Sequence, residues 1–241
     1  MDRRAAAAGV AVLVLAGCGG GGGAAGVPGG GGAIAVEPTP APPAPTPAPP
    51  APPSTAPIAA WGDSLTPPFA ANLQLLYPQR MIYNGGVAGQ SSTEISARQR
   101  ADTGGRNAWI NIFWMGTNNP TQPAQVKADI AASVAALAPG NDRFLVLSVI
   151  NKARPEEIRG GTAYNTIVQL NNELAVAYPG HYLDIRAWLV SQFNPASTQD
   201  VADAQNDVVP SSLRFDEIHL NNDGSVVVAK KVKEFIDAKG W

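Results

Sequence analysis

Asp216 and His219 stand three residues apart in the stretch Asp216-Glu217-Ile218-His219. One helical turn across this spacing would put the carboxylate and the imidazole on the same side. The carboxylate could then accept a hydrogen bond from Nδ1–H, which would leave Nε2 free to take a proton from a hydroxyl group. Acyl transfer through a serine needs this pair and a nucleophile. Ser64, in Gly62-Asp63-Ser64-Leu65 after an apolar run, is the candidate, although a Ser that follows Asp can equally cap a helix.

Two further stretches have residue types that suit such chemistry. A glycine-rich block runs from Asn84 to Ser91, and Gly116-Thr117-Asn118-Asn119 follows the third apolar run. Taken alone, the first is explained by a turn that caps the next helix, and the second by a β-turn. Backbone N–H groups and an Asn amide at these places could also stabilise the negative charge that develops on a substrate oxygen.

The four blocks together resemble, in type and in order, those of the SGNH (GDSL) hydrolases. The resemblance covers essentially all of residues 58–241. It implies that Ser64 is the nucleophile, His219 the base and Asp216 the residue that orients it. It further implies an oxyanion hole formed by the backbone N–H groups of Ser64 and Gly89 and by the amide of Asn118.

Two residues depart from the family pattern. Asn119 stands where Asp is usual, and Leu220 follows His219 where Pro is common. Neither change removes a catalytic group, but the first puts in doubt how the loop after the third strand is held. The Gly-x-Ser-x-Gly elbow of α/β-hydrolases is not found in the sequence.

Short apolar runs alternate with amphipathic, alanine-rich segments from residue 58 onward, which predicts a parallel sheet with helices on both faces. Pro139-Gly140 and Pro179-Gly180 are typical helix stops before a strand. With the resemblance, the expected fold class is α/β: a three-layer α/β/α sandwich with a five-stranded, mostly parallel, flavodoxin-like sheet. The predicted strands are 58–61, 80–83, 109–114, 144–150 and 181–184, and the predicted helices are 67–77, 92–100, 122–137, 162–178 and 223–238.

The N-terminal part predicts an export signal and a tether. Residues 1–17 combine two arginines with an apolar run that is too short to span a bilayer. The run ends in Leu15-Ala16-Gly17-Cys18, which resembles the bacterial lipobox and implies a diacylglycerol modification of Cys18. Residues 18–57 are rich in Gly, Pro and Ala and predict a disordered tether with a polyproline II part. A cell-envelope protein is therefore expected, anchored to a membrane through lipid on Cys18; the resemblance favours the outer membrane.

The amino-acid composition limits the classes of partner and cofactor that we expect for this protein. The net charge is −2 and no basic block is present, so nucleic acid is not an expected partner. Two histidines and one cysteine provide no recognisable zinc ligand set and allow no disulfide within the chain. We therefore expect neither a metal nor a cofactor, and a monomeric protein.

Other notable side chains have simpler interpretations. His181 is expected to be structural, Asp63 to be part of the Ser64 turn, and Glu217 to face away from its neighbours in the triad. The aromatic residues Trp109, Phe113 and Trp114 are expected in the core, although Trp114 could approach the site. Lys230, Lys231 and Lys233 predict the solvated face of the last helix.

The expected function is hydrolysis of short-chain, acetyl-type esters of carbohydrate or envelope components through an acyl-serine intermediate, on a small-molecule or polysaccharide substrate. A lysophospholipase or thioesterase that acts on longer chains is the alternative. A surface lipoprotein that binds without turnover, and acyl transfer to an acceptor other than water, remain open.

Overall fold

The computed structural model describes residues 54–241, so the predicted signal segment, Cys18 and most of the predicted tether lie outside the described residues. Within residues 54–241 the elements follow in the order β1 (Ile58–Gly62), α1 (Thr66–Leu76), β2 (Ile82–Gly86), α2 (Ser92–Arg100), η1 (Arg106–Ala108), β3 (Ile110–Trp114), α3 (Pro123–Ala135), β4 (Phe144–Leu147), α4 (Tyr164–Ala177), β5 (Tyr182–Leu183), α5 (Ile185–Ser191), α6 (Thr198–Gln205), η2 (Ser211–Leu213) and α7 (Asn222–Ala238).

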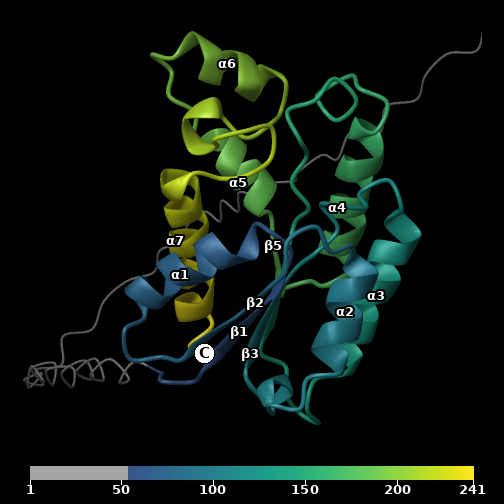
Figure 1. Ribbon diagram of the computed structural model, residues 1–241, viewed down its shortest axis with the longest axis vertical. Helices are drawn as coiled ribbons and strands as arrows, with labels where there is room; N and C mark the ends of the chain where they lie inside the picture. Colours follow the sequence, from purple (N-terminus) through teal and green to yellow (C-terminus); the bar gives the residue numbers. More distant parts are fainter. Residues whose placement is uncertain (1–53) are drawn as a thin grey trace, which may run out of the picture. The chain divides into compact units, whose positions relative to one another are not determined.

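The sheet has the order β2-β1-β3-β4-β5, and every neighbouring pair of strands is parallel. Helices α1, α5 and α7 cover one face, α2, α3 and α4 cover the other, and α6 lies beyond the sheet (Figure 1). The predicted three-layer α/β/α fold is therefore confirmed, with all five strands parallel.

Side-chain alternation along the strands divides the core in two. In β1, Ile58 and Ala60 face the cluster under α1 and α7, whereas Ala59 and Trp61 face the cluster under α2 and α3. Both faces of the sheet are thus buried, which is why its strands read as continuous apolar runs. One polar side chain inside the sheet, Asn111, is satisfied because its Oδ1 accepts a hydrogen bond from the Trp61 indole at 2.8 Å.

Local sequence explains several boundaries. Prolines occupy the first turn of α1, where a missing N–H costs nothing, and Ser91 with Glu94 forms a capping box at the start of α2. Strand β2 begins two residues later than predicted and continues through Asn84 to Gly86, whereas β4 ends at Leu147 rather than at 150. Helices α5 and α6 were missed, because both are short and much of their stability comes from tertiary contacts.

The register of the sheet sets the place of the candidate site. Gly62 pairs with both Gly86 and Trp114, so β1, β2 and β3 end at one level. The loops that carry Ser64, Gly89 and Asn118 leave the sheet at this common edge. Ligands bind beyond the carboxyl ends of strands in open parallel sheets, so this edge is the expected place for chemistry.

Candidate active site

Ser64 lies in a tight turn between β1 and α1. The Asp63 carboxylate accepts a hydrogen bond from Leu65 N at 3.0 Å, and Thr66 N donates to the Asp63 carbonyl at 3.2 Å. A Cβ on Gly62 would lie 2.1 Å from Thr66 Oγ1 and 2.5 Å from the carbonyl oxygen of Trp114. Only glycine therefore allows β1 to turn this sharply beside β3, and the turn leaves Ser64 partly exposed.

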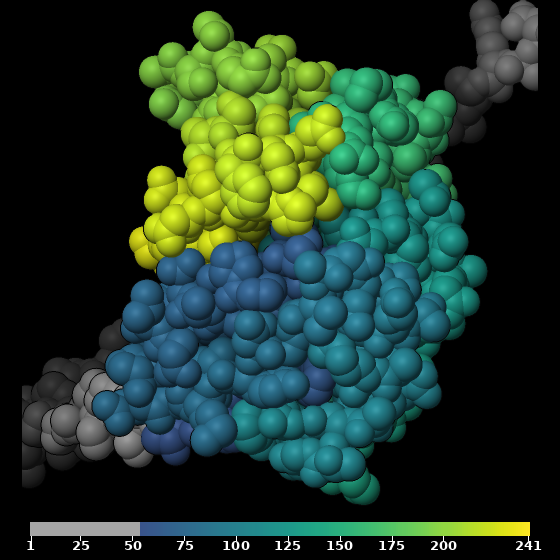
Figure 2. Space-filling view, viewed as in Figure 1, coloured from purple at the N-terminus to yellow at the C-terminus, as the bar shows by residue number. Residues whose placement is uncertain are grey.

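The structure brings Ser64 and His219 together across 155 residues of sequence: Ser64 Oγ lies 3.0 Å from His219 Nε2. His219 Nδ1 lies 2.7 Å from Asp216 Oδ2. The C-terminal segment (yellow in Figure 2) lies directly against the first part of the domain (blue) on this face of the molecule. The three residues thus have the geometry of a nucleophile, a base and a group that orients the base.

The local structure around Asp216 and His219 differs from the predicted helical turn. Residues 215–218 form bends between η2 and α7, and a 3.0 Å hydrogen bond from Phe215 N to His219 O closes this segment. Asp216 Oδ1 accepts from His219 N at 2.6 Å and from Ile218 N at 2.8 Å. The carboxylate itself therefore organises the turn.

Electrostatics keep Asp216 ionised. Burial acts to raise its pKa, but hydrogen bonds from the backbone N–H groups of His219 and Ile218 and from the imidazole outweigh this and hold the pKa at about 2. A carboxylate held in this state can fix one tautomer of His219 and stabilise the imidazolium form during proton transfer.

The turn that carries His219 is anchored by two aspartates of α6, which the sequence interpretation missed. The buried Asp200 accepts hydrogen bonds from Ser211 Oγ and from the backbone and hydroxyl of Ser212. Asp203 accepts from Arg214 at 3.0 Å. The only sign of this in the sequence is that Asp200 and Asp203 are about one helical turn apart, a spacing that puts two side chains on the same face of a helix.

The expected oxyanion residues also converge at this edge of the sheet. Gly89 is exposed and has φ +79, a conformation that L side chains rarely adopt. The Asn118 amide donates to the Gln90 carbonyl at 3.0 Å and to Asp63 Oδ2 at 3.3 Å. Asn118 therefore joins the loop after β2, the loop after β3 and the Ser64 turn.

Asn119, which stands where the family usually has Asp, still holds the loop after β3 in place. It is buried, its Oδ1 accepts from Ser92 N at 3.0 Å, and its Nδ2 donates to Ser92 Oγ at 2.9 Å. The Ser92 hydroxyl in turn donates to Asp129 at 2.7 Å. The loop after β3 is thus fastened to the first turn of α2, with Asp129 of α3 supplying the carboxylate.

Arg98 of α2 is a further residue that the sequence interpretation missed. Its Nε and one terminal nitrogen lie 3.0 Å and 2.9 Å from Gln90 Oε1, and the same terminal nitrogen lies 3.3 Å from the carbonyl oxygen of Gly62. The guanidinium also lies over the Trp61 ring. Arg98 therefore ties the loop after β2 to the end of β1.

Asp63 is buried beneath the site. Desolvation raises its pKa to about 6, although the hydrogen bond from Leu65 N and the nearby His219 act in the opposite direction. Its contacts with Leu65 and Asn118 confirm the expectation that it is a structural member of the turn.

The other side chains singled out in the sequence make packing contacts, hydrogen bonds or ion pairs. His181 stacks on Phe144 with ring centroids 4.1 Å apart, and Trp114 is fully buried with its indole donating to Ser148 O. Glu217 pairs with Arg154. Phe113 is buried and Trp109 packs against the same cluster.

The lysine cluster agrees only in part with the expected solvated face. Lys230 is exposed, whereas Lys231 and Lys233 lie over the rings of Trp188 and Tyr77. Their aliphatic stems thus cover apolar surface while their charges pair with acidic residues of α7.

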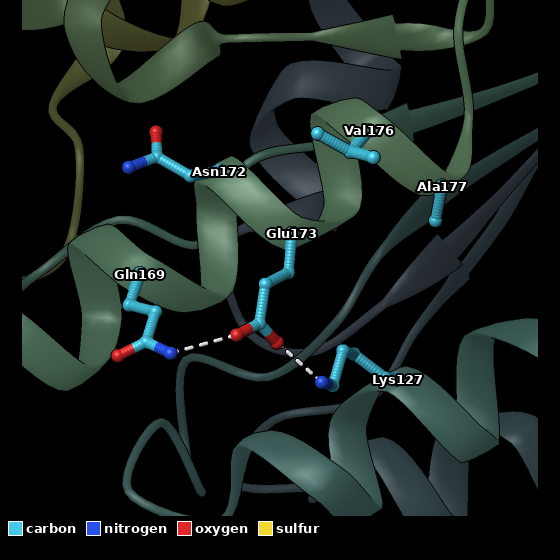
Figure 3. A pocket seen from close by; sticks show the side chains of 6 residues that line it. All are labelled: Lys127, Gln169, Asn172, Glu173, Val176 and Ala177. Carbon is cyan, nitrogen blue, oxygen red and sulfur yellow. Dashed lines mark hydrogen bonds and ion pairs between the residues drawn. The ribbon is translucent and has the colours of Figure 1, made fainter.

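A groove of about 590 Å³ lies elsewhere, between α3 and α4 (Figure 3). Glu173 of α4 accepts a hydrogen bond from Gln169 of the same helix and another from Lys127 of α3. Within residues 54–241 no group of three or more His, Cys, Asp or Glu side chains is arranged to hold a metal ion. In the same part of the chain, no helix has both the length and the apolar character that a membrane span requires.

Sequence comparison with known proteins finds a partial match. No protein-family model matches the sequence. Part of the tail spike protein of Salmonella phage epsilon15 is 29% identical over 145 residues, which are 55% of this chain; the chain spans only 13% of that protein's length.

Three examples illustrate the solved structures that share the architecture. A Bacteroides fragilis protein assigned as an acylhydrolase has a TM-score of 0.61 and 14% identity, covering 78% of this chain and 91% of its own. A Desulfitobacterium hafniense protein assigned to the G-D-S-L family of lipolytic proteins has a TM-score of 0.57 and 16% identity, over 75% and 99% of the two chains. A catalytic mutant of an acetylxylan esterase from Geobacillus stearothermophilus has a TM-score of 0.55 and 15% identity, over 76% and 95%.

These likenesses establish the class of fold. The domain has the α/β/α fold of GDSL-type (SGNH) acylhydrolases and esterases, as the four sequence blocks predicted.

Proposed function

We propose that this chain is a serine ester hydrolase that acts through an acyl-serine intermediate. The single observation that carries the proposal is the aligned set Ser64–His219–Asp216, with separations of 3.0 Å and 2.7 Å between their functional atoms. A hydroxyl, an imidazole and an ionised carboxylate in this order are the parts that nucleophilic acyl transfer requires.

The proposed reaction has two halves. Ser64 Oγ attacks the ester carbonyl while His219 Nε2 takes its proton; the bond to the alcohol oxygen then breaks, and His219 returns the proton to that oxygen. Water next attacks the acyl-serine, with His219 again acting as base, and releases the acid and free Ser64. Both halves pass through a tetrahedral oxyanion.

The backbone N–H groups of Ser64 and Gly89 and the amide of Asn118 are proposed to bind this oxyanion. The exposed, left-handed Gly89 and the position of Asn118 beside Asp63 support this assignment. The contact with Asp63, at 3.3 Å, is the longer of the two that Asn118 makes, so a substrate oxygen would compete for that hydrogen. Loss of one oxyanion donor typically costs about 10²–10³ in turnover.

A paired set of variants tests the proposal. Ser64→Ala should abolish hydrolysis of p-nitrophenyl acetate and labelling by a fluorophosphonate probe, because the nucleophile is lost. Ser191→Ala is the matched control, since this exposed serine of α5 contacts only its own helix and the neighbouring Gln192. Turnover in Ser64→Ala equal to that of the control would refute Ser64 as the nucleophile. A wild-type protein that forms no adduct with the probe would also refute it, and would favour a lipoprotein that binds without turnover.

The proposed substrates are short-chain, acetyl-type esters of carbohydrate or envelope components. The side chains of His219 and Asp216 are 36% and 44% exposed, which suits an open site. The similar acetylxylan esterase from Geobacillus stearothermophilus supports this class of ester. An activity series from acetyl to palmitoyl esters checks the proposal, because a preference for long chains would favour a lysophospholipase or thioesterase.

Location is a separate proposal that rests on the sequence. We propose that Cys18 carries the lipid that anchors the protein to a bacterial envelope membrane, since it ends an apolar run as the last residue of a lipobox-like tetrapeptide. Metabolic labelling with radioactive palmitate should mark the wild type and not Cys18→Ser. Equal labelling of both proteins would refute the anchor.

A further inference from the structure

Phe215 places an exposed aromatic ring beside the imidazole of His219. The ring is 71% exposed, its centroid lies 5.6 Å from that of the imidazole, and the two planes differ by only 10°. The hydrogen bond from Phe215 N to His219 O fixes this offset-stacked arrangement within one short turn. A lone exposed aromatic residue needs no explanation, but one stacked on the proposed base does.

The chemistry of ester cleavage decides which part of a substrate would meet Phe215. His219 must return its proton to the alcohol oxygen, so the alcohol part of the ester lies on the imidazole side of the reacting carbon. The carbonyl oxygen points instead toward Gly89 and Asn118. A side chain from the His219 turn therefore borders the alcohol part and not the acyl group.

The turn that carries Phe215 also carries one member of an ion pair, because Glu217 follows Phe215 by two residues. Glu217 accepts a hydrogen bond from Arg154 Nε, and their side chains are 54% and 47% exposed. The Glu217 carbonyl accepts from Ala153 N at 2.8 Å, which holds the two segments together. A guanidinium and a carboxylate that remain half exposed can still exchange hydrogen bonds with hydroxyl groups.

A flat apolar face on a turn that also holds a half-exposed ion pair is complementary to one kind of alcohol. A pyranose ring has a face of C–H groups and a rim of hydroxyls, whereas an alkyl alcohol lacks the rim and a glycerol unit lacks the flat face. We propose that Phe215, with the Arg154–Glu217 pair, forms a binding site for the alcohol part of the ester and that this part is a pyranose ring. The inference rests on the proposed esterase function and goes beyond it by assigning a substrate class to particular residues.

Two acetyl esters that differ only in the alcohol test the inference. The substrates are a mono-O-acetylated methyl xylopyranoside and ethyl acetate. In Phe215→Leu, the ratio of kcat/KM on the sugar ester to kcat/KM on ethyl acetate should fall about five- to tenfold, mainly through a higher KM for the sugar ester. Phe215→Trp should restore the ratio because it restores an aromatic face. Leu75→Ala, which truncates a similarly exposed side chain on α1, is the control and should leave the ratio unchanged.

The outcomes separate this inference from the function on which it rests. An equal loss on both esters in Phe215→Leu would mean that the ring only supports the imidazole, and would overturn the proposed sugar site while leaving the esterase intact. A ratio that Phe215→Trp fails to restore would count against stacking in the same way. A wild-type protein that hydrolyses neither ester would remove the esterase function and the sugar site together.

Discussion

Arg98 offers the sharpest test of how the site is held together. Its guanidinium makes two hydrogen bonds to Gln90 Oε1 and one to the Gly62 carbonyl. The Gln90 carbonyl in turn accepts from the Asn118 amide at 3.0 Å. Arg98 touches no reacting atom in the proposed mechanism, so we regard it as a positioning residue for the oxyanion donors.

The size of the effect follows from these contacts. Hydrogen bonds to a charged group contribute about 1.5–3 kcal/mol, and partial exposure of Arg98 lowers this to about 1–2 kcal/mol. If this free energy keeps the loop in the donor geometry, Arg98→Ala should lower kcat by about 5- to 30-fold. KM should change little, because the donors act most strongly in the transition state.

Steady-state kinetics on p-nitrophenyl acetate measure both constants, and urea denaturation measures the accompanying loss of stability. Arg98→Lys keeps the charge without the planar fork, so an intermediate kcat is expected. Arg100→Ala is the matched control, because this exposed arginine of the same helix contacts only Ser96 O of its own helix. A kcat for Arg98→Ala within twofold of the control would refute the positioning role.

Three further predictions follow from the acidic and amide groups of the site. Asp216→Asn should lower kcat on p-nitrophenyl acetate by about 10³–10⁴, since it removes the charge that stabilises imidazolium; a loss below tenfold would contradict this. The pKa of Asp63 is raised from 3.8 to about 6, so the folded state binds this proton more tightly and the stabilisation is lost as pH rises from about 4 to 6. Urea unfolding should show that the free energy of unfolding of the wild type falls across this pH range by up to about 3 kcal/mol relative to Asp63→Asn. Parallel pH profiles of the two proteins would contradict the raised pKa of Asp63. Asn119→Asp removes the donor to Ser92 Oγ and adds a carboxylate near Asp129, so the free energy of unfolding should fall by about 1–3 kcal/mol; an unchanged urea midpoint would be evidence against this account.

The sequence alone predicted the layers and most of the elements. Continuous apolar runs such as Ile58–Trp61 predicted strands buried on both faces, and alternation with amphipathic segments predicted parallel pairing. These patterns are local, so they can be read without knowing what packs against them. The two helices between residues 185 and 205 were not predicted, because they have only 7 and 8 residues and depend on tertiary contacts.

In the candidate site, too, the sequence identified the residues but not the local backbone that positions them. Ser64, Gly89, Asn118, Asp216 and His219 could be named because each lies in a short stretch with a recognisable pattern, and their catalytic roles stay predictions. The Asp216–His219 spacing suggested a helical turn, whereas the structure has bends that are organised by the carboxylate itself. Residue spacing limits which side chains can meet, but it does not specify the backbone that joins them.

The sequence by itself determined which residue types make up the candidate site, their order along the chain and the strand ends that carry them. Only the tertiary structure decided which distant groups meet, as Ser64 and His219 do across 155 residues. It also decided that Arg98 holds the loop after β2 and that Phe215 stacks on the imidazole. The physical reason is that such contacts depend on how the whole chain packs, and a short stretch of sequence contains no information about its partners in space.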